Sequence, residues 1–114
     1  MSRITTIEFP VFSDFIIHVE ISNDFDKTIS KYPNIKNFAD GTNQNCDALT
    51  IHENESPLVF IFLKHNVSVG TIAHESWHAL CHMFETVGVD MDSETIAYHL
   101  GFLVNAIFRF MRRK

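Results

Sequence analysis

Two histidines and a glutamate stand at a spacing that suits metal chemistry. The segment 71–80 contains His74, Glu75 and His78, which match the pattern H-E-x-x-H. On a helix, residues four apart lie about 40° apart around the axis, so both imidazoles can reach one metal ion from one face. Glu75 is offset by about 100° from His74, which suits a general base acting on a water bound to the ion better than a ligand. No other position in this segment is charged or proline, which favours a buried helix that can hold the ion.

A catalytic zinc takes three protein ligands and leaves one position open for water. The chain is expected to reverse between Gly88 and Asp92, and Glu94 opens the next predicted helix. We therefore expect Glu94 to be the third ligand. Asp90 and Asp92 are the alternatives, although Asp92 also suits the helix cap, and His99 is a more distant one.

Several other side chains near this set could either take part in the site or simply pack. Tyr98 lies one turn beyond Glu94, where it can steady the ligand's carboxylate, donate to a developing oxyanion or simply pack. Cys81 returns to nearly the face of His74 and as a fourth ligand would close the site, but we favour a small buried apolar side chain. We expect Trp77 to pack in the core, and we give no role to the histidines that lack partner spacing: His18, His52 and His65.

Hydrophobic periodicity predicts the elements that must position these residues. Runs rich in β-branched residues predict strands over residues 15–21, 48–52 and 58–64, the last two joined as a hairpin. A short helix is expected over residues 25–31, followed later by two long helices. The predicted fold is α+β: a small three-stranded sheet packed on one face against the two long C-terminal helices, the metal helix and the third-ligand helix.

Residues that suit helix ends set the bounds of these helices. Asn23 or Asp24 suits the start of the short helix, and Ser68 the start of the metal helix. That helix is expected to end at Gly88, a good residue for a left-handed C-terminal turn. Asp92 or Ser93 suits the start of the last helix, which should run nearly to the C-terminus.

Length and charge narrow the class of protein. Because the chain has 114 residues, we expect one domain over residues 1–114. Its net charge is −5. Four basic residues stand among the last six, which leaves five basic against fourteen acidic residues in 1–108. This acidic body argues against nucleic acid as a partner, and the basic end suits the negative end of a helix dipole. No apolar run is long enough for a membrane span, and two cysteines without a spacing motif suit a reducing cytoplasm.

The two segments 74–78 and 94–98 give the chain a family resemblance. It resembles the minimal zincins of the gluzincin type, and more closely small peptidase-like proteins encoded by bacteriophages, with "I-A-H-E-x-x-H-A", a glycine turn and "E-x-x-A-Y-x-x-G". Here Ile72, Ala73, Gly88 and Gly101 extend the match, which in motif covers about residues 68–102. The resemblance implies zinc bound by the two histidines and Glu94, with Glu75 catalytic, and a location in the host cytoplasm if the chain is phage-encoded.

The expected activity is zinc-dependent hydrolysis of a peptide or protein substrate. If segment 58–64 lies at the sheet edge, the substrate can pair with it as an added strand. The alternative is a weakly active or inactive zincin scaffold that serves as a phage protein-binding module. The last predicted helix favours this alternative, because it is apolar nearly all round. A homodimer through that helix would cover the excess.

Overall fold

The computed structural model describes residues 3–10, 14–35, 46–53, 56–88 and 92–113. Four strands form one sheet in the order β1-β2-β4-β3. β1 pairs with β2 and β3 with β4 in antiparallel fashion, whereas β2 and β4 are parallel. The strands are β1 (Arg3–Glu8), β2 (Ile16–Ile21), β3 (Ala48–His52) and β4 (Leu58–Leu63). The sheet is therefore mixed, and the α+β class is confirmed.

The prediction of three strands was wrong because β1 was not expected. Its segment Ile4–Ile7 is β-branched throughout, which is typical of strands. Only Ile7 of this strand is buried, so the alternation of apolar and polar residues that marks a half-buried strand is weak. Pairing with β2 along its whole length holds β1 in place instead.

Strand β4 lies inside the sheet, between β2 and β3. Every residue from Val59 to Leu63 is buried, which explains its uninterrupted apolar sequence. Segment 58–64 therefore does not meet the condition for peptide addition, which was that it lie at the sheet edge. The edge on this side of the sheet is β3, which pairs with β4 alone among the described strands.

The three described helices begin at the predicted caps. They are α1 (Phe25–Ile29), α2 (Val69–Val87) and α3 (Ser93–Arg112). The side chains of Asp24, Ser68 and Asp92 each accept a hydrogen bond from the backbone N–H three residues further on, as N-caps do. Gly88 ends α2 with φ of 72°, a left-handed conformation that glycine adopts at little cost.

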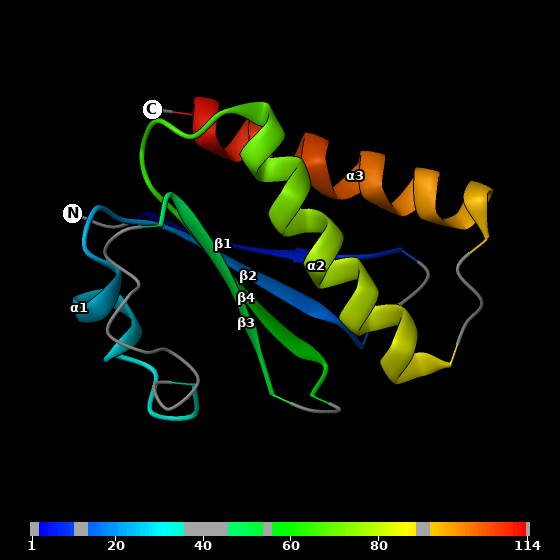
Figure 1. Cartoon of the computed structure of the whole chain (residues 1–114), viewed down its shortest axis with the longest axis horizontal. Helices are drawn as coiled ribbons and strands as arrows, with labels where there is room; N and C mark the ends of the chain where they lie inside the picture. Colours follow the sequence, from blue (N-terminus) through cyan, green and yellow to red (C-terminus); the bar gives the residue numbers. More distant parts are fainter. Residues whose placement is uncertain (1–2, 11–13, 36–45, 54–55, 89–91, 114) are drawn as a thin grey trace.

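The sheet carries helices on both faces, not on one (Figure 1). Successive residues of a strand point to opposite faces. Val59, Ile61 and Leu63 belong to the apolar cluster that includes the inner residues of α2 and α3. Phe60 and Phe62 belong to a second cluster, with residues of α1. The two long helices share one face, as predicted, and α1 lies on the other.

Helix α3 uses most of its apolar surface within its own chain. Leu103, Ile107 and Phe110 are buried, and its other large apolar residues, apart from Tyr98, pack half-buried against the same cluster. The excess apolar surface that led us to expect a homodimer is thus largely covered within the chain, and the homodimer itself stays a prediction.

Arg109 and Arg112 lie in the last turn of α3, where positive charges interact favourably with the negative end of the helix dipole. No helix among the described residues is long and apolar enough to cross a membrane.

Candidate active site

Helix α2 brings the side chains of His74 and His78 together. Their Nε2 atoms lie 3.1 Å apart, and the ring centroids are separated by 4.7 Å. Both side chains are exposed on the helix surface, so the two nitrogens face a common point that solvent can reach. The spacing of one helical turn that the sequence indicated is realised in this pair.

The separation of the two nitrogens fits a zinc ion. Two nitrogens that bind one tetrahedral zinc at about 2.0–2.1 Å stand roughly 3.3 Å apart. The 3.1 Å between His74 and His78 is close to this value. In a metal-free chain the same distance also suits an N–H···N hydrogen bond between the rings.

Glu75 is held beside this pair. Its residue is only 8% exposed, and a carboxylate at such a place requires hydrogen-bond donors. The hydroxyl of Thr50 on β3 donates to Oε1 of Glu75 at 2.7 Å, and the backbone oxygen of Glu75 lies 3.2 Å from the same hydroxyl. The other carboxylate oxygen, Oε2, lies 3.9 Å from Nε2 of His74. The carboxylate therefore connects the edge strand to the histidine pair.

A shallow hollow separates the edge strand from this face of α2. It is lined by Glu75, His78 and Cys81 of the helix and by residues of β3, including Thr50 and His52. Neither Thr50 nor His52 was expected to belong to the site. The sequence did contain one indication that they lie together. They are two positions apart on a predicted strand, so both side chains lie on the same face of the sheet.

His52 is a neutral imidazole in this setting. Its ring stacks on that of His82, with centroids 3.7 Å apart, and His82 Nε2 lies 2.8 Å from the backbone oxygen of Ser56. Burial lowers the pKa of His52 below its usual value, and the nearby His82 and His78 lower it further. A hydrogen bond to the backbone of Glu53 and the charge of Glu85 act in the opposite direction. His52 therefore lines the hollow without adding a positive charge at neutral pH.

The structure does not bring Glu94 into a set with the two histidines. Among the described residues, no group of three or more His, Cys, Asp or Glu side chains is arranged to hold a metal ion. Glu94 is exposed in the first turn of α3. Further along the same helix, His99 contacts the ring of Phe84. Because α2 and α3 run antiparallel (Figure 1), Glu94 lies level with the end of α2, past Phe84 and away from the pair.

The alternatives to Glu94 have separate positions. Asp92 is the N-cap of α3 and accepts from both the backbone N–H and the hydroxyl of Thr95, which lowers the pKa of its carboxyl. His99 is buried, with Nδ1 2.8 Å from the backbone oxygen of Thr95. Asp90 lies outside the described residues. The third ligand thus stays a prediction.

The structure places Cys81 in the lining of the hollow and Tyr98 outside it. Tyr98 is 58% exposed on α3, in contact with the ring of His99, and does not line the hollow beside Glu75. Cys81 is half-buried and does line it. Burial raises the pKa of the Cys81 thiol, and Glu85 raises it further. A protonated thiol suits a lining residue better than a metal ligand.

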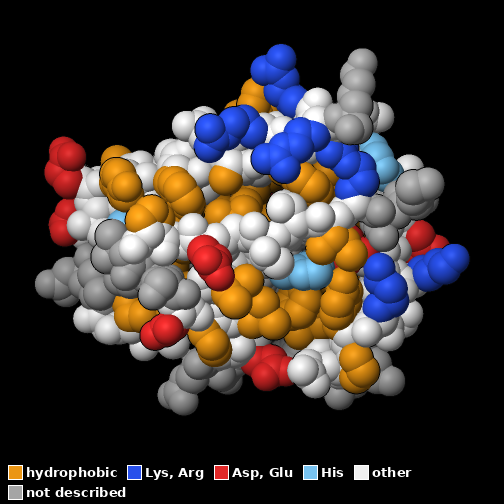
Figure 2. Space-filling model, turned by 180° about the vertical axis from the view of Figure 1, so that it is seen from behind, with side chains coloured by type: hydrophobic (Ala, Val, Ile, Leu, Met, Phe, Trp, Pro, Cys, Tyr) orange, Lys and Arg blue, Asp and Glu red, His pale blue; other side chains and the backbone are white. Residues whose placement is uncertain are grey.

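A second group of ionisable side chains lies on the other face of the sheet, the side viewed in Figure 2. The fully buried carboxylate of Glu20 on β2 accepts from the hydroxyl of Tyr32 and from Nζ of Lys31, both at 2.6 Å. His18 lies 3.3 Å from the same carboxylate. Burial and the Glu20 carboxylate raise the pKa of Tyr32. This group ties the segment after α1 to the sheet, away from the histidine pair.

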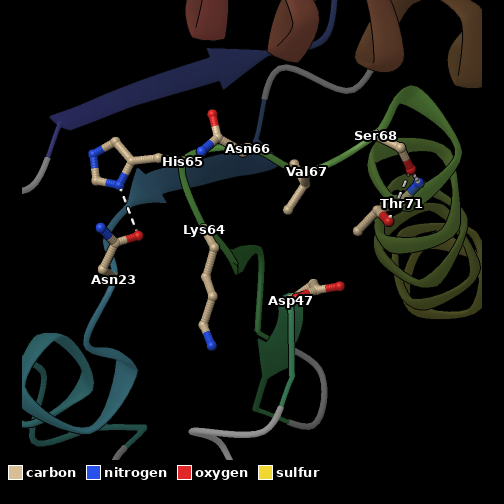
Figure 3. Close-up of a pocket in the computed structure, with 8 residues that line it drawn as sticks. All are labelled: Asn23, Asp47, Lys64, His65, Asn66, Val67, Ser68 and Thr71. Carbon is tan, nitrogen blue, oxygen red and sulfur yellow. Dashed lines mark hydrogen bonds between the residues drawn. The ribbon is translucent and has the colours of Figure 1, made fainter.

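A further hollow lies at the N-terminal end of α2 (Figure 3). Residues 64–68 line it together with Asn23, Asp47 and Thr71. Within it, Nδ1 of His65 lies 2.9 Å from Oδ1 of Asn23. It contains none of the residues that the spacing indicated for chemistry.

Comparison with protein-family profiles, with curated proteins and with solved structures found no match for this chain. Function must therefore be inferred from the geometry and chemistry of the site itself.

Proposed function

We propose that the chain is a zinc-dependent metallopeptidase-like protein with its centre on α2. The observation that carries the proposal is the facing pair of Nε2 atoms of His74 and His78, 3.1 Å apart, with the Glu75 carboxylate fixed beside it. His74 and His78 would hold the ion. The third ligand, predicted as Glu94 with Asp90 and Asp92 as alternatives, stays a prediction.

Zinc, when bound, polarises a substrate carbonyl and makes a water acidic enough to attack at neutral pH. Glu75 then acts as the general base: its carboxylate takes the proton from the attacking water and passes it to the leaving amine. The side chain is suited to this task because one oxygen is anchored by Thr50 while the other faces His74.

The substrate would add as an extended strand along the edge of β3. Lys64 N–H donates to the backbone oxygen of Asp47, directly opposite, and hydrogen-bonded pairs alternate with unbonded ones in antiparallel strands. The N–H and C=O groups of Ala48, Thr50 and His52 therefore point away from β4, toward the open edge. A peptide paired there would lie beside the hollow that Glu75 and His78 line.

The test is the substitution Glu75→Gln, which removes the base and keeps the side-chain size. We expect peptide hydrolysis to be lost while zinc content stays that of the native chain. Glu85→Gln, an exposed residue on the same helix, is the matched control and should keep activity. Hydrolysis that persists in Glu75→Gln would contradict the assignment of the base.

The second candidate function is a binding module built on the same scaffold. Its support is the exposure of apolar side chains along α2: Val69 is 52% exposed, and Trp77, expected in the core, is 40% exposed. Trp77 stands three residues after His74, so the two side chains are neighbours on the surface of α2. A partner seated on Trp77 would therefore also cover the histidine pair. A chain that holds zinc and cleaves no member of a broad peptide library would favour this candidate over the peptidase.

A further inference from the structure

The contact between Thr50 and Glu75 joins two parts of the site that are far apart in the sequence. Thr50 lies in the middle of the edge strand β3, and Glu75 lies on α2, 25 positions later. Their 2.7 Å hydrogen bond ends on a carboxylate that is nearly buried. Hydrogen bonds to an ionised acceptor are shorter and stronger than those between neutral groups.

The same residue also meets the expected substrate. The main chain of Thr50 points its N–H and C=O away from β4, toward the side of β3 where no described strand pairs, while its side chain points to α2. A strand that pairs with β3 would therefore be aligned by the residue that holds the base. Such a link matters because small misplacements of a reacting group are costly in rate.

We propose that Thr50 is a positioning residue that fixes the rotamer of Glu75 relative to a peptide bound along β3. This inference rests on the proposed peptidase function. The hydroxyl of Thr50 selects the position of Oε1, which leaves Oε2 on the side of His74. Thr50 itself takes up no proton and touches no reacting atom.

The first test is kinetic and uses the full zinc-loaded chain. In Thr50→Val the hydroxyl is lost but the shape and the backbone are kept, so kcat should fall about tenfold or more while KM for an extended peptide stays unchanged. Thr50→Ser, which restores the hydroxyl, should recover kcat. A Thr50→Val protein with native kcat, in a chain where Glu75→Gln is inactive, would overturn the proposal.

The second test needs no activity and uses the metal-free protein. Three-bond couplings by NMR report whether the Glu75 side chain holds a single χ1 rotamer. We expect one rotamer in the native chain and in Thr50→Ser, and averaging over rotamers in Thr50→Val. A single rotamer in all three would overturn the role of Thr50. A native chain that holds zinc and cleaves no peptide would instead refute the peptidase function, and the couplings would still decide the positioning role.

Discussion

Hydrogen bonds and charges around single side chains decide what the site can do. The facing imidazoles of His74 and His78, one anchored carboxylate and the neutral imidazole of His52 share the surface between α2 and β3. Thr50 and His52 complete this surface from the strand. The H-E-x-x-H pattern on α2 therefore contains only part of the site.

At this scale, His52 should make the stability of the protein depend on pH. Its folded-state pKa is lowered by burial and by His82, so the unfolded chain takes up a proton at a higher pH than the folded chain. The contribution is fully present above the unfolded value of about 6.5 and is lost as pH falls from there toward the folded pKa. We expect the free energy of unfolding, from urea titrations, to drop between pH 7.5 and 5.5.

The control for this effect is His52→Phe, which keeps a ring to stack on His82. The drop should be smaller in this variant than in the native chain, because other histidines continue to titrate and His52 does not. Equal pH dependence in the two proteins would contradict the assigned protonation of His52.

The ends of the helices and the order of the strands determine where these side chains lie. Helix α2 must stop before the chain returns as α3, and Gly88 makes that stop with a positive φ. A Cβ at this position would meet no atom within 4 Å. A side chain at position 88 would therefore lower stability only through the positive φ of the backbone, not through a steric clash.

We expect Gly88→Ala to lower the free energy of unfolding by about 1 kcal/mol, since alanine is strained in the left-handed region. Gly88→Asn should cost less, because asparagine tolerates that region better. Urea unfolding of the two variants measures the difference. If alanine were no worse than asparagine, the left-handed stop at Gly88 would be wrong.

Much of the frame could be predicted from local signals in the sequence. Capping by Asp24, Ser68 and Asp92 follows from side chains that reach the nearest free N–H groups, and the C-terminal stop of α2 follows from Gly88. Strand β1 could not be recognised because one buried residue leaves little periodicity. The place of β4 inside the sheet depends on pairing with distant segments, which local sequence does not specify.

The histidine pair could be predicted for the same reason as the caps: its geometry is local to one helix. The third ligand depends on how α3 packs against α2. Phe84 and His99 are in contact where the two helices pack, and Glu94 lies beyond this contact, toward the end of α2. The contact between Thr50 and Glu75 likewise depends on which strand lies beside the helix.

As a whole, the molecule is a sheet between unequal layers, with the two long helices on one face and α1 on the other (Figure 1). The site lies where α2 meets the edge strand β3. On the face viewed in Figure 2, many of the Lys and Arg side chains gather at one rim, whereas Asp and Glu side chains are scattered. Arg3 of β1 joins the sheet to the C-terminal part of α3, through a 2.7 Å hydrogen bond to the backbone oxygen of Phe110. The histidine pair lies on α2, within an otherwise acidic chain, which favours the approach of a cation.

Binding of zinc to the folded chain should stabilise the whole domain. A ligand that binds only the folded state adds about 2.7 kcal/mol when its free concentration is a hundred times its Kd. Thermal unfolding should therefore shift upward on addition of zinc and return on addition of a chelator. In His78→Ala the shift should be absent, whereas a shift of native size would place zinc elsewhere in the chain.

The most direct test of the central claim is the zinc content of the purified protein, measured by elemental analysis. We expect one zinc per native chain, and loss of zinc in His74→Ala and in His78→Ala, with both variants still folded by circular dichroism. The same measurement on Glu94→Ala decides the third ligand. A native chain without zinc, or histidine variants that keep it, would contradict the metal centre on α2.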